Sequence, residues 1–375
     1  MKLPECMLEN LETPCVVIDE VLAKENIRRV QAECDKAGVA LRPHIKTHKM
    51  PYFARLQVEA GAKGITSCKV SEAEVMADGG LDDIFLAYPL VGRPKLERAM
   101  LLSKRVKRLI LAVDSVEQAQ ALNEAAGRAG IVQEVRMEVD TGAKRTGVTK
   151  EKRLALAKAL KDMKNLKLTG IYTFKSLILD EKPTEDNEAA GEEEGRLLEE
   201  IRRELLELGF ENLEVSGGST PTGLQVARTG KVDEIRPGTY IFNDYMLTKE
   251  KAAKPEDIAV RIFATVVSVP ADDYAVIDGG TKTFPMDILL DQAPYYYNSY
   301  AMVKGREDLE LRRMNEEHGI LVSTKGKVDL KVGDILELVP IHGCTAINMQ
   351  NQVYLYDSEK GIIRKEKVAG RGMLF

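Results

Sequence analysis

Eight short runs rich in β-branched residues alternate with longer helical patterns between residues 21 and 245 of this 375-residue chain. Between the runs, segments such as Glu25–Ala37 and Val116–Ala129 repeat apolar residues at helical spacing. Alternating strand and helix predicts parallel strands, and eight such units predict closure into a (β/α)8 TIM barrel rather than an open sheet. The eight runs lie near Val39–Ile45, Gly64–Thr66, Asp83–Ala87, Arg108–Val113, Glu134–Val139, Lys167–Phe174, Asn212–Val215 and Val232–Ile235.

The pattern changes after Lys254, where strand-like runs follow one another across turns with no long helical pattern between them. Such a pattern is typical of a compact all-β domain. We therefore expect a barrel over 21–245 and a smaller all-β domain built from 1–20 plus 246–375. The runs after Lys254 lie near Val260–Val269, Tyr274–Ile277, Ile320–Ser323, Ile335–Val339 and Gln352–Tyr356, and Thr13–Asp19 is also strand-like.

Charge and composition exclude several classes of protein. Charged residues make up 30% of the chain and the net charge is only −5, which argues against a nucleic-acid or anionic-membrane partner. No apolar run approaches the roughly 20 residues that a membrane span requires. The first ten residues, MKLPECMLEN, lack the basic and apolar regions of a signal peptide, so we expect a cytoplasmic location.

Lys46 follows the first predicted barrel strand, within the sequence P-H-I-K-T-H-K (43–49). Chemistry in a β/α barrel collects at the carboxyl ends of the strands. A lysine directed into the barrel mouth can lose its proton through desolvation and act as a nucleophile. On spacing alone, a nucleophilic Lys46 and a basic surface cluster over 43–49 are equally good interpretations.

A Gly-rich turn, S-G-G-S-T-P-T (216–222), follows the seventh predicted strand. Its small residues let backbone N–H groups approach an anion, and its hydroxyls add donors. Barrels often hold phosphate in the loops after strands seven and eight, so the position favours a phosphate site over a simple turn.

Arg145 follows the fifth predicted strand, in D-T-G-A-K-R-T-G (140–147). Its guanidinium could face a phenolate, carboxylate or phosphate at the barrel mouth. It could equally pair with Asp140 in a structural ion pair, and the sequence leaves both possibilities open.

His342 and Cys344 lie two residues apart in the β domain of a chain that has only four histidines. On an extended strand, residues two apart project to the same face. Imidazole and thiolate together suit zinc, although two ligands leave the remaining positions to water, substrate or another residue. On spacing alone, a structural role for the pair is the stronger interpretation.

The order of these motifs resembles the D-threonine aldolase and D-serine dehydratase family. The resemblance covers nearly the whole chain, and a P-H-x-K-T-H-K motif with a late H-x-C is specific. It is carried by T-P-C-V-V-I-D (13–19), R-P-H-I-K-T-H-K (42–49), D-T-G-A-K-R-T-G-V (140–148), S-G-G-S-T-P-T (216–222), R-P-G-T-Y-I-F-N-D (236–244), I-D-G-G-T-K-T-F (277–284), N-E-E-H-G (315–319) and P-I-H-G-C (340–344).

The resemblance implies an alanine-racemase-type fold, pyridoxal 5'-phosphate as cofactor, and a homodimer with active sites near the subunit interface. It also implies roles for individual residues. Lys46 would be the Schiff-base lysine, and Arg145 and Tyr240 would lie around the cofactor ring. The cofactor phosphate would bind Gly218, Ser219 and Thr220, and His342 and Cys344 would bind Zn²⁺ or another divalent metal beside the substrate β-hydroxyl.

Within this family, cysteine rather than aspartate at the second metal position favours a dehydratase. We therefore expect a lyase that converts a D-β-hydroxy amino acid such as D-serine to a 2-keto acid and ammonia. The alternatives are a D-threonine aldolase, which releases glycine and an aldehyde, and a metal-free amino-acid racemase. Two stretches depart from the family pattern: 170–175 lacks the Y-x-G-H type of sequence, and 294–300 is unusually rich in tyrosine.

Overall fold

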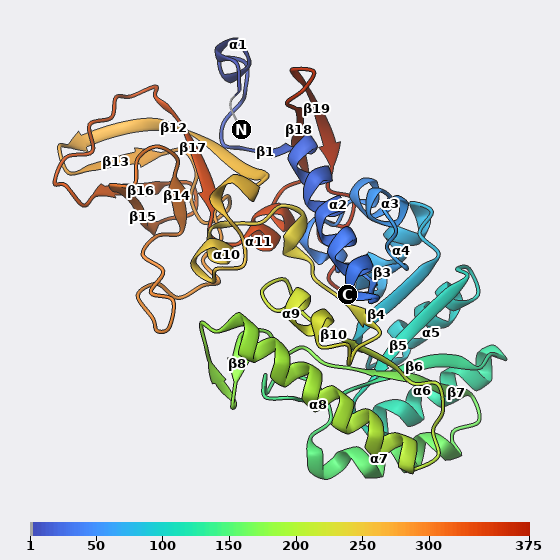
Figure 1. The fold of residues 1–375 in the computed structure, drawn as a ribbon. Helices are drawn as coiled ribbons and strands as arrows, with labels where there is room; N and C mark the ends of the chain where they lie inside the picture. Colours follow the sequence, from blue (N-terminus) through green and yellow to red (C-terminus); the bar gives the residue numbers. More distant parts are fainter. Residues whose placement is uncertain (1–2) are drawn as a thin grey trace. The chain divides into compact units, whose positions relative to one another are not determined.

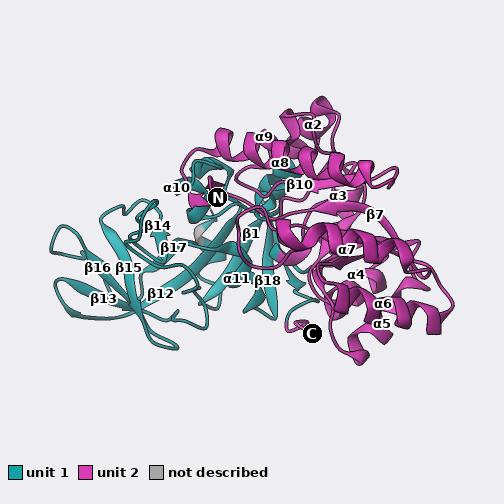
Figure 2. Ribbon diagram, turned by 90° about the horizontal axis from the view of Figure 1, so that it is seen from below, with its two compact units in different colours: residues 1–27, 47–49, 239–371 teal, residues 28–46, 50–238, 372–375 magenta. Residues whose placement is uncertain are grey.

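The computed structural model describes residues 3–375 and divides the chain into two compact units (Figure 2). One unit, called here the barrel unit, contains Arg28–Lys46, Met50–Gly238 and Gly372–Phe375. The other, called the β unit, contains Met1–Ile27, Thr47–Lys49 and Thr239–Arg371.

The barrel unit is built on eight parallel strands in the order β2-β11-β10-β7-β6-β5-β4-β3. A parallel bridge between His44 and Thr66 joins the two ends of this order, so that the strands close into a barrel. All eight coincide with the runs expected from the sequence, and the expected β/α barrel followed by a β domain is confirmed. The strands are β2 (Ala40–Leu41), β3 (Ile65–Ser67), β4 (Asp83–Pro89), β5 (Arg108–Val113), β6 (Gln133–Glu138), β7 (Leu166–Tyr172), β10 (Glu214–Gly217) and β11 (Glu234–Ile235).

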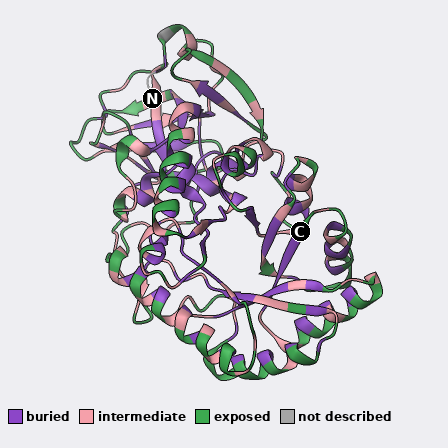
Figure 3. Ribbon diagram, turned by 45° about the vertical axis from the view of Figure 1, so that its right-hand side comes forward, coloured by how far each residue is buried: buried purple, intermediate pink, exposed green. Residues whose placement is uncertain are grey.

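Helices follow most of these strands and carry the exposed residues of the unit, whereas the strands are mainly buried (Figures 1 and 3). Strands buried on both faces read as continuous apolar runs, and for this reason they could be recognised in the sequence. The helices are α3 (Pro51–Glu59), α4 (Val70–Asp78), α5 (Arg93–Ser103), α6 (Val116–Ala129), α7 (Lys150–Asp162), α8 (Asn187–Glu207) and α9 (Gly223–Arg228), with the small hairpin β8 (Ile178–Leu179) and β9 (Lys182–Pro183) before α8. The helix α2 (Glu20–Ala37) begins in the β unit and ends in the barrel unit.

Buried ion pairs join barrel residues that lie far apart in the sequence. Arg42 donates to Glu234 at 3.0 Å and to Asp83 at 2.6 Å, and Arg136 pairs with both Glu234 and Glu214. Burial alone would raise the pKa of Glu234, but Arg136 and Arg42 outweigh it and hold that pKa well below the usual range. The charged network therefore ties five strand regions of the barrel together.

The β unit contains a six-stranded barrel in which β12, β13, β16, β15, β14 and β17 pair in a closed ring. Every pairing in this ring is antiparallel, and β1, β18 and β19 extend the sheet from β12. The strands are β1 (Cys15–Asp19), β12 (Val260–Ala271), β13 (Tyr274–Ile277), β14 (Ala301–Val303), β15 (Leu309–Met314), β16 (Gly319–Ser323), β17 (Ile335–Pro340), β18 (Gln352–Asp357) and β19 (Ile362–Lys367). Short helical segments complete the unit: α1 (Glu5–Leu8), η2 (Thr239–Ile241), α10 (Tyr245–Lys249), η3 (Pro255–Asp257) and α11 (Gly343–Asn348).

Three strands of the β unit, β14, β15 and β19, were not expected from the sequence. The first is only three residues long, and the other two carry several charged side chains. β19 lies at the edge of the sheet, where charged residues discourage pairing with other chains and hide the apolar alternation. Sequence pattern alone therefore misses those strands of this unit that are very short or rich in charge.

Candidate active site

Lys46 lies in a short 3-10 turn, Ile45–Thr47, shortly after the first barrel strand. The segment is fixed from both neighbouring strands. The His44 N–H donates to Pro237 O at 3.0 Å, after the eighth strand, and the Thr66 N–H donates to Pro43 O at 2.8 Å. Half-buried Lys46 therefore stands at the carboxyl end of the barrel, where the sequence placed it.

Positive charge surrounds the aromatic ring of Phe174, which follows the sixth barrel strand. Lys46 Nζ lies 5.8 Å from the ring centroid and Arg145 Cζ lies 4.4 Å from it. Cys68 belongs to the same group, with its Sγ 3.2 Å from His44 Nε2. We call these five residues, His44, Lys46, Cys68, Arg145 and Phe174, the Lys46 cluster; it offers two cations beside an aromatic face.

The pKa of the Cys68 thiol is shifted both by burial and by the charged groups near it. Burial and the neighbouring Glu72 raise it to about 11, while Lys46 and Arg145 act in the opposite direction. The thiol therefore stays protonated at neutral pH and adds no negative charge to the cluster.

Arg145 does not form the structural ion pair that the sequence left open. Asp140 instead accepts the backbone N–H groups of Gly142 at 2.9 Å and Lys144 at 3.1 Å. Asp140 thereby shapes the loop after β6, and the exposed Arg145 side chain extends over Phe174.

The Gly-rich turn 218–222 joins β10 to α9 and gathers several hydroxyl groups. Ser219 Oγ lies 3.2 Å from Ser176 Oγ and 3.1 Å from Thr222 Oγ1. Thr220 Oγ1 accepts the Gly238 N–H at 3.2 Å, which links the loops after the seventh and eighth strands. The turn is therefore rich in groups that can donate to a phosphate.

Gly218 takes part in this turn through its conformation. Its φ of +70° is a left-handed value that favours glycine, and an added Cβ would lie 2.9 Å from Gly223 Cα. Its N–H donates at 2.7 Å to the fully buried carboxylate of Glu194 on α8. Glu194 thus holds the turn in place, and its own pKa is raised by burial.

His342 and Cys344 come together at the start of a helix and not on a strand, which corrects the geometry expected from the sequence. β17 ends at Pro340, His342 is the N-cap of α11, and Cys344 is the second residue of that helix. The Gly343 N–H between them donates to buried Asp244 at 2.9 Å, which fixes the first turn. The two side chains are nevertheless hydrogen-bonded to each other.

Acidic and polar groups surround His342. Asp287 Oδ2 lies 2.7 Å from His342 Nδ1 and accepts from Thr345 Oγ1 at 2.8 Å. Burial would lower the pKa of His342, but Cys344 and Asp287 outweigh that effect and raise it to about 11. We call Asp244, Asp287, His342, Cys344 and Thr345 the His342 cluster; its negative surroundings suit a cation.

Two hydroxyl groups contact the buried Cys344 thiol. Thr47 Oγ1 lies 3.1 Å and Thr239 Oγ1 3.4 Å from Cys344 Sγ. Hydroxyls that donate to a thiolate stabilise its charged form. Thr47 directly follows Lys46 in the chain. Buried Tyr240 lies in η2, next to Thr239.

Thr47, Thr239, Asp244 and Asp287 are site residues that sequence reasoning missed. Thr47 and Thr239 stood inside the recognised motifs at 42–49 and 236–244, and these motifs were the available signal for them. Asp287 lies between β13 and β14, in a stretch with no regular period, and nothing in the sequence connects it with His342.

The described part of the chain limits what the His342 cluster can bind by itself. Among residues 3–375, no group of three or more His, Cys, Asp or Glu side chains is arranged to hold a metal ion. The pair His342 and Cys344 therefore offers two protein ligands at most.

None of the helices within residues 3–375 has the length and apolar character needed to cross a membrane.

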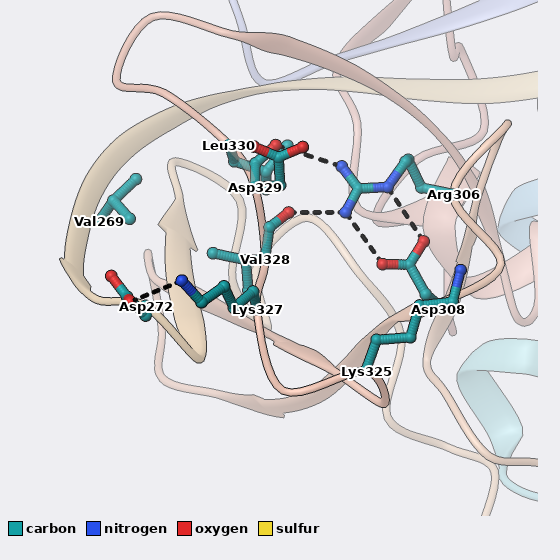
Figure 4. Close-up of a pocket in the computed structure, with 9 residues that line it drawn as sticks. All are labelled: Val269, Asp272, Arg306, Asp308, Lys325, Lys327, Val328, Asp329 and Leu330. Atoms are coloured by element: carbon teal, nitrogen blue, oxygen red, sulfur yellow. Dashed lines mark hydrogen bonds and ion pairs between the residues drawn. The ribbon is translucent and has the colours of Figure 1, made fainter.

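A hollow in the β unit has a volume of about 680 Å³, but most of its charged groups form ion pairs or hydrogen bonds with one another (Figure 4). Arg306 forms two hydrogen bonds to Asp308, at 2.9 and 3.0 Å, and Lys327 pairs with Asp272 at 3.4 Å. We assign no chemistry to this hollow, since these pairs leave little charge for a ligand.

Comparison with known proteins finds two family models on this chain. The model "Alanine racemase, N-terminal domain" matches residues 18–246, and the model "Putative serine dehydratase domain" matches residues 259–356. The first covers more than half of the chain and contains all eight barrel strands. Barrel and site together define the class: an alanine-racemase-type β/α barrel joined to a serine dehydratase domain.

The individual proteins to which this chain is similar include a dehydratase and aldolases. The chain is 33% identical to the D-threo-3-hydroxyaspartate dehydratase of Delftia sp., over 90% of this chain and 92% of the relative. It is 29% identical to the D-threonine aldolase of Arthrobacter sp., over 92% of this chain and 89% of the relative. The crystal structure of D-threonine aldolase from Filomicrobium marinum superposes with a TM-score of 0.85 at 26% identity, covering 98% of this chain and 97% of that one.

The chain belongs to the D-threonine aldolase and D-serine dehydratase family, whose members are pyridoxal-phosphate-dependent lyases. The resemblance inferred from the motifs is thereby confirmed, as is the expectation that the chain is an enzyme of this type.

Proposed function

We propose that this protein is a pyridoxal-phosphate- and metal-dependent dehydratase of a D-β-hydroxy amino acid such as D-serine. Its products would be a 2-keto acid and ammonia. The observation that carries the proposal is that an imidazole and a thiol, His342 and Cys344, come together beside the carboxylate of Asp287, whose negative charge favours a cation. Imidazole and thiolate are ligands that suit zinc.

The residues of the barrel unit fit pyridoxal phosphate, which combines an aromatic ring with a phosphate. Lys46 and Arg145 place two cations beside the Phe174 ring, and they match the negative charge of such a cofactor. Lys46 would hold the cofactor covalently, and Arg145 and Tyr240 would contact its ring.

The turn after β10 would hold the cofactor phosphate. Ser219 and Thr220 supply hydroxyls, and Gly218 supplies the left-handed turn that brings the backbone close to the anion. Because the Gly218 N–H is bonded to Glu194, Gly218 would act through this conformation while neighbouring groups donate to the phosphate.

When bound, the cofactor supplies an electron sink for negative charge at the substrate Cα. Lys46 would take the Cα proton as general base, since the amine that holds the cofactor lies beside the substrate Cα once the substrate has replaced it. Arg145 would orient the substrate or cofactor through charge, and Phe174 would shield one side of the amine from water.

His342 and Cys344 would hold Zn²⁺ or another divalent metal, which supplies Lewis acidity for the substrate β-hydroxyl. Thr47 and Thr239 would hold the Cys344 side chain in place, and Asp244 would fix the backbone between the two ligands. We also expect a homodimer in the cytoplasm, with a small D-amino acid as substrate and no nucleic-acid partner.

Aldol cleavage to glycine and an aldehyde is the second candidate reaction. The carboxylate of Asp287, which contacts both His342 and Thr345, favours it because such a group can accept the proton of a β-hydroxyl. The Arthrobacter relative is a D-threonine aldolase, and its similarity to this chain is close to that of the Delftia dehydratase.

Product analysis distinguishes these reactions. The purified protein, loaded with cofactor and zinc, would be incubated with D-serine, D-threonine and D-threo-3-hydroxyaspartate, with and without a chelator. We expect a keto acid and ammonia, lost with the chelator and restored by zinc. Glycine and an aldehyde would identify an aldolase, and an L-amino acid formed regardless of chelator would identify a metal-free racemase; either would refute the dehydratase assignment.

A further inference from the structure

Asp287 lies three residues after the I-D-G-G-T-K-T-F motif (277–284) and is itself outside the family motifs used above. It lies in the irregular segment between β13 and β14, and its side chain is exposed apart from two contacts. Its Oδ2 accepts from His342 Nδ1 at 2.7 Å and from Thr345 Oγ1 at 2.8 Å. Both contacts are to residues at the first turn of α11.

A carboxylate at Nδ1 has a defined effect on a metal-binding histidine. Neutral imidazole carries one proton, and the hydrogen bond on one nitrogen decides which nitrogen keeps its lone pair. In the neutral form that binds a metal, donation of Nδ1–H to Asp287 leaves the lone pair on Nε2, and Nε2 becomes the metal-binding atom. The same bond fixes the rotation of the ring and raises its basicity as a ligand.

The other carboxylate of the cluster, Asp244, serves a different purpose. Its Oδ2 accepts the Gly343 N–H at 2.9 Å and its Oδ1 accepts the Leu247 N–H at 3.0 Å. Buried Asp244 therefore holds backbone at the starts of α11 and α10. Asp287 takes no part in these bonds to the backbone of α10 and α11, so its replacement would leave them in place.

We propose that Asp287 is a positioning residue that fixes the tautomer and orientation of His342 for metal binding. Thr345 fixes Asp287 in turn, through the hydrogen bond to the same carboxylate oxygen. The inference rests on the proposed function, in that it requires a metal at His342 and Cys344. It adds a residue to the site that the H-x-C motif alone does not contain.

The test measures zinc affinity of the full-length, cofactor-loaded protein by competition with a chromogenic chelator. Asp287→Ala should weaken zinc binding by about 10–100-fold, the usual effect of removing such a partner. Asp287→Asn keeps an oxygen acceptor for Nδ1–H and should recover part of that loss. Cofactor content and the thermal unfolding of the metal-free protein should not change.

Asp291→Asn is the matched control, because Asp291 lies in the same segment but pairs with Arg312, at 2.6 Å, away from His342. This variant should bind zinc as the parent does. Unchanged zinc affinity in Asp287→Ala would overturn the proposal, and so would a loss as complete as that of His342→Ala, since Asp287 would then be a ligand itself. If His342→Ala bound zinc as the parent does, the metal site of the proposed function would fail instead.

Discussion

The two clusters of this chain carry opposite charge. In the barrel unit, Lys46 and Arg145 place cations around Phe174. In the β unit, Asp244 and Asp287 place carboxylates around His342. The first environment suits an anionic ring with a phosphate, and the second suits a metal cation. Under the proposed function each unit would recognise one of these two groups, and each group could be lost without the other.

The largest expected effect is that of Lys46→Ala. Removing the amine should abolish the visible absorbance of lysine-bound cofactor and lower turnover on the order of 10³-fold or more, because nucleophile and base are lost together. Absorbance spectra and steady-state rates measure both effects. Lys164→Ala, at an exposed lysine, serves as control. An absorbance band that survived Lys46→Ala would show that another residue holds the cofactor.

His342→Ala and Cys344→Ala should act on the other unit. Each removes one of the two proposed protein ligands, so zinc content should fall toward zero and elimination of the hydroxyl should drop by about 10²-fold or more. Cofactor content should remain near that of the parent. Metal analysis and the cofactor spectrum of the same samples check this, and loss of cofactor with retained zinc would contradict the separation of the two sites.

The smallest expected effect is that of Glu250 on the way in which the stability of the fold depends on pH. Burial, assisted by the charge of Asp244, raises the pKa of Glu250 from 4.5 to about 8. Between those two pH values the folded state holds a proton that the unfolded chain has lost, so stability falls as pH rises through this range. Glu250→Gln should reduce that fall by at most about 4 kcal/mol across the window.

Denaturant unfolding of the metal-free protein from pH 5 to pH 8 measures this slope in the parent and in Glu250→Gln. Glu256→Gln, at an exposed carboxylate, should leave the slope unchanged. An equally steep slope in Glu250→Gln would mean that other groups carry the pH dependence, and that the acidic character of the β unit does not extend to Glu250.

The positions of Lys46 and of the turn 218–222 were predictable because barrel topology is regular. Each predicted strand ends at the same side of the barrel, so a lysine after the first strand and a Gly-rich turn after the seventh have defined places. The β unit offers no such rule. In this unit, strand β14 is only three residues long and strand β15 carries several charged residues. The helix α11 is six residues long, which is too short to show a periodic pattern.

The sequence by itself determined the alternation of strands and helices, the order of the motifs and therefore the family. These follow from local pattern, which is encoded within a few residues. Only the tertiary structure decided that Asp287 meets His342 across 55 residues and that Thr47 meets Cys344 across 297 residues. It also decided that the Gly218 N–H donates a hydrogen bond to the Glu194 carboxylate. Side-chain contacts at such separations depend on how whole elements pack, and no local spacing records them.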